Sequence, residues 1–200
     1  MATASPTPLI TFPTTLAAND ANMQAQLAAA NGFRPFIEAA ARQFGFQPSV
    51  ICGIGSRESG WGLLLKPPGP AGTGDRAPRS PRPPLRPGPL PPDGLGFGRG
   101  LMQIDFDSNP LAQTGNWQDP QTNINFGCQL LAHKLSYVQR NSGLQGLMLL
   151  RGALAAYNCG EGTVCKLAAA GLDIDSKTAH ANYSAGVLNL AGFFQLNGWA

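Results

Sequence analysis

The stretch SVICGIGSRESGW, residues 49–61, decides the fold. Pro48 comes directly before it, and proline suits the first turn of a helix because the N–H that it lacks is not needed there. Gly60 is typical of the residue that ends a helix. The segment therefore predicts a nearly uncharged helix from residue 49 to about residue 59, with Glu58 near its C-terminal end. Its apolar stripe is formed by Val50, Ile51 and Ile54.

Helices are expected on both sides of this segment, because apolar residues recur there at helical spacing and Gly, Pro and Asp stand at the ends. A short strand is expected at residues 101–106, after the glycine-rich run DGLGFGRG of residues 93–100. The predicted fold class is mainly α (α+β), with a small β and loop insert after the helix that carries Glu58. The other expected helices span residues 20–30, 35–44, 120–140, 144–157, 163–170 and 178–196.

Proline sets one segment apart from the rest of the chain. Residues 66–92 hold eleven of the eighteen prolines, which remove backbone donors and exclude both helix and central strand. We expect a long insert loop there, within a single domain over residues 19–200, and a flexible N-terminal arm at residues 1–18. Residues 66–93 contain five basic and two acidic residues, and so account for the whole net charge of +3.

Several function classes are excluded by composition. The longest apolar stretches, residues 50–54 and 146–150, are too short for a membrane span. No basic leader followed by an apolar run begins the chain, so no clear signal peptide is predicted. No basic helix favours nucleic acid, and without CxxC pairs or clustered histidines no metal site is predicted. The four cysteines are compatible with two disulfides in three possible pairings or with buried free thiols.

Glu58 is the acidic residue with the most unusual surroundings among the three glutamates. Glu38 has Arg42 four residues later, as in an ordinary surface ion pair, and Glu161 begins a helix, where a carboxylate is favoured. The apolar helix before Glu58 and the negative end of the helix dipole both raise its pKa. A carboxyl that stays protonated near neutrality is what a general acid needs. An ion pair with Arg57 or Arg99 is the structural alternative.

Four blocks of sequence carry a family resemblance: SRESGW (56–61), GLMQID (100–105), AAYNCG (155–160) and NYSAGV (182–187). In this order they resemble the goose-type lysozymes and the related soluble lytic transglycosylases, over roughly residues 33–194. The resemblance implies a lysozyme-like helical domain without a cofactor. It also implies attack on the β-1,4 bond of bacterial peptidoglycan after N-acetylmuramic acid. We expect a monomer whose partner is peptidoglycan, secreted or otherwise acting on the cell wall.

The resemblance assigns catalytic roles to three carboxyl groups. Glu58 matches the general acid, and Asp105 matches an aspartate that holds the attacking water in an inverting reaction. A second aspartate precedes the GLMQID block in goose-type enzymes, and Asp93 is its best match, with a spacing one residue longer. Asp75, in the sequence GTGDR, competes for that role because the proline-rich insert blurs the alignment. A turn or a helix cap is the structural alternative for Asp105.

The same blocks assign substrate-binding residues. Gln103, Tyr157 and Asn158 match residues that line the sugar cleft and support the glutamate, and Tyr183 matches a late tyrosine near it. The region after Asp105 departs from the family, which often has a histidine there. A capping role at a helix end is the structural alternative for the Tyr157–Asn158 pair.

Three functions follow as hypotheses. The first is a muramidase that uses Glu58, Asp105 and Asp93. The second is a lytic transglycosylase, in which Glu58 acts alone and the product ends in 1,6-anhydro-muramic acid. The third is a binding protein without turnover, either an inactive sugar-binding relative or a ligand of SH3-type grooves through PRPPLR at residues 81–86.

Overall fold

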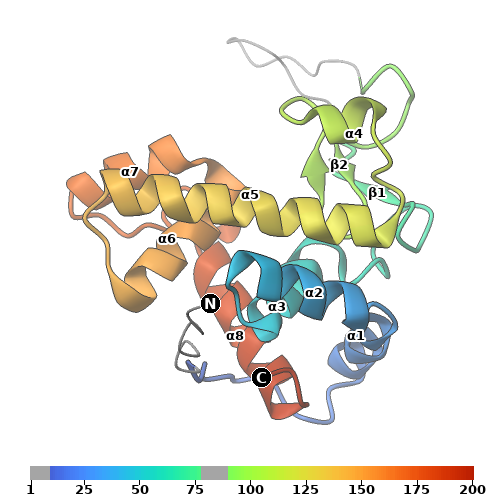
Figure 1. Cartoon of the computed structure of the whole chain (residues 1–200), viewed down its shortest axis with the longest axis horizontal. Helices are drawn as coiled ribbons and strands as arrows, with labels where there is room; N and C mark the ends of the chain where they lie inside the picture. The colour runs from blue at the N-terminus through green and yellow to red at the C-terminus, as the bar shows by residue number, and fades with distance from the viewer. Residues whose placement is uncertain (1–9, 78–89) are drawn as a thin grey trace, which may run out of the picture.

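A computed structural model describes residues 10–77 and 90–200 of the chain. The described residues form a mainly α fold with a small sheet inserted after the helix that carries Glu58, which confirms the expected class (Figure 1). The strands are β1 (Thr73–Gly74), β2 (Gly98–Arg99) and β3 (Ile104–Asp105). The helices are α1 (Ala21–Gly32), α2 (Arg34–Phe44), α3 (Pro48–Ser59), α4 (Pro110–Thr114), α5 (Pro120–Asn141), α6 (Gly146–Cys159), α7 (Glu161–Ala169) and α8 (Tyr183–Leu196).

Helix α3 is the centre of the core and packs closely on α8. Two of its glycines allow this packing. A Cβ at Gly53 would lie 2.5 Å from the carbonyl oxygen of Val187 in α8, and a Cβ at Gly55 would lie 2.5 Å from the ring of Trp61. The apolar helix predicted from residues 49–59 is therefore confirmed, and its small residues set how near α8 and Trp61 come.

The long helix α5 crosses the molecule and joins the sheet region at one end to α6 and α7 at the other (Figure 1). The helix predicted over residues 120–140 is confirmed, and the apolar stripe along one of its faces is buried or packed half-buried against the core. A second, smaller apolar cluster lies between α5, α6 and α7. The stripe consists of Ile124, Cys128, Leu131, Leu135 and Val138.

The sheet is antiparallel in the order β1-β2-β3, and Gly98 of β2 pairs with both Gly74 and Asp105. The strand expected at residues 101–106 is confirmed only at Ile104–Asp105. The residues before it form a turn, because Gly100 has φ 67° and Gln103 has φ 47°.

The structure corrects the start of one predicted helix, adds a short helix that was not predicted and changes the partner of Glu38. The helix expected from residue 178 begins at Tyr183, because residues 179–181 form a 3₁₀ turn in which His180 has φ 59°. Helix α4 was not predicted; proline stands at its first position, as in several other helices of this chain. Glu38 forms its ion pair with Arg34, at 3.1 Å, rather than with Arg42.

Residues 10–18 of the expected N-terminal arm lie against α8. Phe12 is buried, and its N–H donates to Oε1 of Gln195 at 2.9 Å. The N–H of Thr15 donates to Oδ1 of Asn189 at 2.8 Å. Residues 1–9 and residues 78–89 of the proline-rich insert, which include the PRPPLR sequence, lie outside the described residues.

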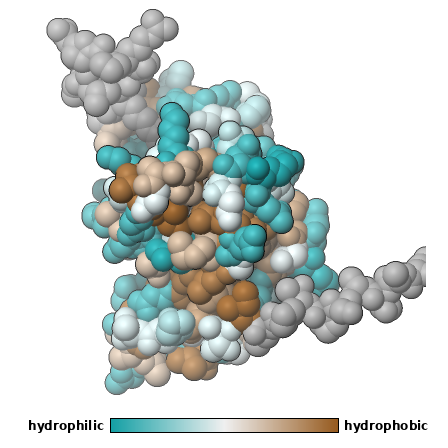
Figure 2. Space-filling view, turned by 90° about the vertical axis from the view of Figure 1, so that its left-hand side faces the viewer, coloured by the Kyte–Doolittle hydropathy of each residue, from teal (hydrophilic) through white to brown (hydrophobic). Residues whose placement is uncertain are grey.

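All four cysteines are free thiols, and Cys52 and Cys128 are buried in the core. Across residues 10–77 and 90–200, no helix combines the length and apolar character that crossing a bilayer requires. Apolar side chains gather in the middle of the face shown in Figure 2 and are surrounded by polar ones. Leu147 and Met148, at the start of α6, are among the exposed apolar residues.

Candidate active site

A cleft of about 740 Å³ brings together residues from distant parts of the sequence. The end of α3 and the small sheet contribute its acidic residues, and α5 and α6 contribute the opposite lining. The cleft is lined by Glu58, Asp75, Gly98, Gln103, Asp105, Ser108, Asn109, Leu130, His133, Lys134, Ala156, Tyr157, Asn158 and Gly160.

Glu58 lies in the last turn of α3, which ends because Gly60 adopts the left-handed conformation at φ 55°. Its side chain is half-buried and lines the cleft. Burial raises the pKa of the Glu58 carboxyl to about 7, although a hydrogen bond from Tyr183 and the charge of Arg57 oppose the rise. The carboxyl is therefore about half protonated at neutral pH, as expected from the sequence.

Tyr183 supports Glu58 from behind the cleft. It is almost fully buried at the start of α8, and its hydroxyl donates a hydrogen bond to Oε1 of Glu58. The guanidinium of Arg57 lies 5.7 Å from the centre of the Tyr183 ring. Tyr183 is absent from the cleft lining, so its position suits a role toward Glu58 rather than direct contact with a sugar.

Tyr157 and Asn158, at the end of α6, both line the cleft. The Tyr157 hydroxyl donates to the carbonyl of Met102 at 2.9 Å, which ties α6 to the turn before β3. Burial, with the nearby Glu58, raises the pKa of Tyr157 well above its usual value, so the phenol stays a donor. The side-chain oxygen of Asn158 accepts from the N–H of Ala179 at 2.8 Å.

Gln103 lies over two glycines of the sheet. A Cβ would approach its Oε1 to 2.2 Å from Gly74 and to 2.1 Å from Gly98, so only glycine leaves room for this side chain. Its amide nitrogen donates to the carbonyl of Gly100 at 2.8 Å. Glycine at positions 74 and 98 thus allows the Gln103 side chain to approach the sheet closely.

Asp105 lies at the end of β3 and lines the cleft with Glu58. The hydroxyl of Ser108 donates to its Oδ2 at 2.8 Å, and the amide of Asn109 donates to its main-chain carbonyl at 3.0 Å. These bonds close the turn that follows β3 and fix the direction of the carboxylate. Asp105 therefore takes part in a turn, as the structural alternative expected, and lines the cleft as well.

Asp75 and Asp93, the two candidates for the second aspartate, differ in position. Asp75 follows β1 with φ 45° and lines the cleft, whereas Asp93 is not part of the lining. Asp93 instead pairs with Arg99 at 2.9 Å, and this hydrogen bond lowers its pKa. The φ of 45° places Asp75 in the left-handed region, which aspartate adopts more readily than most non-glycine residues.

The ion pair with Arg99 explains why the Asp93 side chain lies outside the cleft lining. Its side chain is fully buried, and its guanidinium lies 4.8 Å from the ring centre of Phe106 and 5.3 Å from that of Trp117. A buried cation requires a carboxylate partner, and Asp93 provides it. The ion pair between Glu58 and Arg99, the structural alternative for Glu58, is therefore replaced by the pair between Arg99 and Asp93.

Three residues of the site were not predicted. The amide of the buried Asn123 donates to the carbonyls of Arg99 and Trp117 at 3.0 and 3.1 Å and accepts from the N–H of Met102 at 2.8 Å, so it clamps the turn between β2 and β3. His133 and Lys134 line the cleft from α5, and Lys134 also pairs with Glu161. The spacing of Leu130, His133 and Lys134 on one helix face is a signal that could have indicated them.

The site combines a proton donor, two further carboxylates and neutral hydrogen-bonding groups in one open cleft. Among the described residues no group of three or more His, Cys, Asp or Glu side chains is arranged to hold a metal ion. The groups present are those of acid–base chemistry at a polar, uncharged bond such as a glycosidic one.

Comparison with known proteins gives a consistent result. A family model described as the transglycosylase SLT domain matches residues 35–171. The chain is 29% identical to "Lysozyme g" of Gallus gallus over 174 residues, which cover 86% of this chain and 68% of that protein. It is 27% identical to "Lysozyme G" of Dromaius novaehollandiae over 168 residues, 84% of this chain and 68% of the relative. It is 26% identical to "Lysozyme g" of Epinephelus coioides over 166 residues, 82% and 74% of the two chains.

Proposed function

Since the chain belongs to the transglycosylase SLT domain family, within the lysozyme-like group, we propose that it is a muramidase. It is a lysozyme-like enzyme that acts on peptidoglycan, and the bond we assign to it is the β-1,4 bond between N-acetylmuramic acid and N-acetylglucosamine. The protein acts on the bacterial cell wall as a secreted monomer in this proposal, without a cofactor and without a nucleic-acid partner.

One observation carries the proposal: Glu58 lines the cleft with a pKa of about 7. A carboxyl with the usual pKa near 4.5 would be ionised at neutral pH and would have no proton to give. Glu58 keeps its proton up to neutrality, so it donates that proton to the glycosidic oxygen as the bond to C1 of the muramic acid breaks.

The other carboxylates provide the second half of an inverting reaction. Asp105 and Asp75 both line the cleft on the side formed by the sheet, whereas Glu58 belongs to α3. They orient a water molecule whose oxygen bonds to C1 while one of them takes the water's proton. We assign the second aspartate to Asp75 rather than to Asp93, whose carboxylate is engaged by Arg99.

Neutral side chains hold the sugar chain. Gln103, Tyr157 and Asn158 line the cleft around Glu58 and offer amide and hydroxyl groups that suit sugar hydroxyls and acetamido groups. Tyr183 acts on Glu58 rather than on the substrate, because it is buried behind that carboxyl.

A lytic transglycosylase is the second candidate, and the description of the matching family model favours it. In that reaction Glu58 first gives its proton to the leaving oxygen and then takes one from the 6-hydroxyl of the same muramic acid, which closes a 1,6-anhydro ring. No water-holding aspartate is needed. The presence of Asp105 and Asp75 in the cleft favours hydrolysis.

Mass spectrometry of the soluble products separates the two reactions. Purified insoluble peptidoglycan is digested, and the masses of the released muropeptides are compared. Hydrolysis leaves muramic acid ends that are one water heavier than anhydro ends. We expect the heavier ends. A majority of anhydro ends would show that the enzyme is a lytic transglycosylase.

The non-enzymatic hypothesis is tested with the Glu58→Gln variant. A binding protein would hold peptidoglycan equally well with and without the Glu58 proton and would release no fragments in either form. The proposed enzyme releases fragments as wild type and loses this activity in the variant, while the variant still sediments with the cell wall.

A further inference from the structure

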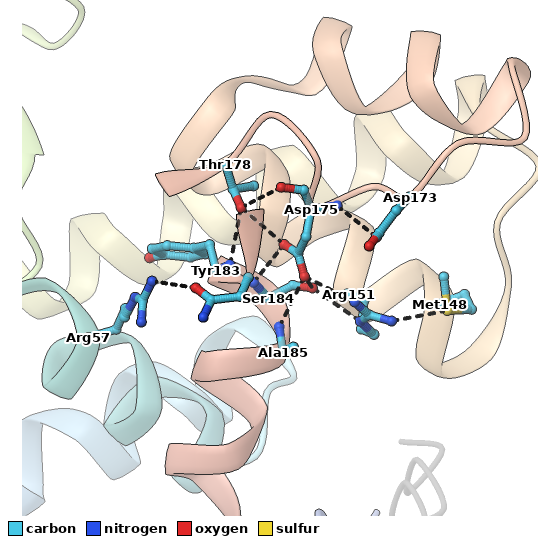
Figure 3. A network of polar contacts seen from close by, with 10 residues as sticks. Arg57, Met148, Arg151, Asp173, Asp175, Thr178, Tyr183, Ser184 and Ala185 are labelled. Carbon is cyan, nitrogen blue, oxygen red and sulfur yellow. Dashed lines mark hydrogen bonds and ion pairs between the residues drawn. The ribbon is translucent and has the colours of Figure 1, made fainter. Parts of the chain in front are cut away.

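We propose that Asp175 is a positioning residue for Glu58: by capping α8, it fixes the Tyr183 hydroxyl that donates to the Glu58 carboxyl. Figure 3 shows the network around it. Asp175 lies in the loop between α7 and α8 and is not part of the cleft lining. The inference rests on the proposed function, in which Glu58 is the general acid.

Asp175 is an almost fully buried carboxylate with a full set of donors. Its side chain is 1% exposed. Its Oδ1 accepts from the N–H of Ser184 at 2.8 Å, and its Oδ2 accepts from the N–H of Ala185 at 3.2 Å and from the Ser184 hydroxyl at 2.6 Å. The guanidinium of Arg151, on α6, donates to Oδ2 at 3.0 Å.

These contacts make Asp175 the cap of α8. The residue in the usual capping position, Asn182, makes no side-chain bond to the helix. The first N–H groups of a helix lack partners within it, so a carboxylate that accepts two of them stabilises that end. Asp175 does so from a position nine residues before Ser184, and its pKa is lowered because these hydrogen bonds outweigh the opposing effect of burial.

Thr178 completes the arrangement at Tyr183 itself. Its hydroxyl oxygen accepts from the N–H of Tyr183 at 3.1 Å, and the same hydroxyl donates to the carbonyl of Asp175 at 2.8 Å. The first three residues of α8 are therefore tied to one loop. Because Tyr183 is the first of them, its ring and hydroxyl follow the position of the Asp175 loop.

Tyr183 passes this constraint to Glu58. Its hydroxyl donates to Oε1 of Glu58, and the Arg57 guanidinium, which donates to Oδ1 of Asn182 at 2.9 Å, covers its ring. The loss of the cap releases the start of α8, weakens the Tyr183 hydrogen bond and removes an interaction that favours the ionised form of Glu58.

Other charged and titratable groups near Glu58 and Asp175 also influence the titration of Glu58, so the test must distinguish their effects from that of Asp175. Those facing Glu58 or sharing its cleft are Arg57 on α3, Tyr157 on α6, Tyr183 on α8, His133 and Lys134 on α5, and Asp75 and Asp105 at the sheet. Those near Asp175 are Arg151, Cys159 and Asp173, whose Oδ1 accepts from the Asp175 N–H at 3.0 Å.

The experiment titrates the Glu58 carboxyl directly by ¹³C NMR, which needs no turnover. Four proteins are compared: wild type, Asp175→Asn, Tyr183→Phe and the double variant. We expect a midpoint near 7 in wild type, an upward shift of about one pH unit in each single variant, and no further shift in the double variant. At about pH 5, where Glu58 is protonated in all four proteins, steady-state rates on cell walls are expected to show a lower kcat with little change in KM, because the variants hold the carboxyl less firmly.

Val138→Ala is the matched control, because Val138 is buried in the small apolar cluster and outside the cleft lining. It loses stability without touching the polar network, and its Glu58 midpoint is expected to equal that of wild type. An unchanged midpoint in a folded Asp175→Asn protein overturns the inference, as does an equal shift in Val138→Ala. If Asp175→Asn does not fold, Ser184→Ala decides, since it removes one of the donors to Asp175; an unchanged midpoint there overturns the inference too.

The two proposals fail separately. A wild-type protein that releases no peptidoglycan fragments removes the proposed function but leaves the titration of Glu58 as a test of the cap. If the enzyme is active but its Glu58 titration midpoint is the same in wild type and Asp175→Asn, the proposed function stands and the positioning role of Asp175 is excluded.

Discussion

The Tyr183 hydroxyl donates a hydrogen bond to Oε1 of Glu58, and this contact joins the start of α8 to the end of α3. Burial raises the pKa of Glu58, while the bond from Tyr183 and the charge of Arg57 limit the rise. The three effects balance at a pKa of about 7. The buried helix contact thus sets the pH range in which Glu58 carries the proton that cleavage needs.

The first prediction concerns the pH dependence of activity. The protonated form of Glu58 predominates below its pKa of about 7, so kcat/KM falls as the pH rises through that value. The measurement is the initial rate of cell-wall clearing between about pH 5 and pH 9. A decline centred near 4.5 instead would mean that Glu58 titrates as an ordinary carboxyl.

The second prediction concerns stability. Because folding raises the pKa of Glu58 from 4.5 to about 7, the folded state binds this proton more tightly, and stability is lost as the pH rises between those values. Glu58→Gln removes that loss. We expect the variant to be more stable than wild type by roughly 1–3 kcal/mol at pH 8 and equal to it below the unfolded pKa, as measured by urea unfolding.

Glu38→Gln is the control for this effect. Glu38 is partly exposed on α2 and pairs with Arg34, so its substitution is expected to change stability little at either pH. A similar gain in both variants, or none in Glu58→Gln, would contradict the burial of a proton-binding carboxyl.

The third prediction separates the two candidate aspartates. Asp75→Asn is expected to lower kcat about 10²-fold, because Asp75 lines the cleft. Asp93→Asn is expected to keep wild-type kcat but to lose about 1–3 kcal/mol of stability, because it leaves the buried Arg99 without its carboxylate. Rates on cell walls and urea unfolding of both variants measure this. The reverse pattern would return the catalytic role to Asp93.

The fourth prediction concerns the glycine floor of the cleft. In Gly98→Ala the new methyl group would lie 2.1 Å from Oε1 of Gln103 and must displace that side chain. We expect KM for peptidoglycan fragments to rise severalfold, with a smaller change in kcat. Gly162→Ala is the control, because nothing lies within 4 Å of its Cβ position in α7; an equal effect of both substitutions would rule out the Gln103 contact.

Local signals made the helices predictable. Proline at the first turn and glycine at the end mark α3, and a regular apolar stripe marks α5, so both were predicted nearly to their ends. The pKa of Glu58 was predictable in direction because its neighbours along the chain are apolar. Features that depend on distant partners were not predictable. The late start of α8, for example, depends on a 3₁₀ turn and on the distant Asp175 carboxylate.

The positions of the two candidate aspartates, Asp75 and Asp93, show the same limit. Spacing along the chain favoured Asp93, because the proline-rich insert separates Asp75 from the block that contains Asp105. In three dimensions β1 pairs with β2 and β2 with β3, so Asp75 and Asp105 line the same cleft from the two edges of the sheet, while Asp93 pairs with Arg99. Strand pairing across an insert of this length cannot be inferred from spacing.

The central claim is that Glu58 supplies the proton for cleavage, and the release of soluble fragments from insoluble peptidoglycan at pH 6 tests it most directly. We predict that Glu58→Gln releases fragments about 10³-fold more slowly than wild type while it binds the same amount of cell wall. A variant that keeps a rate within about tenfold of wild type would contradict the claim, since glutamine has no proton to donate.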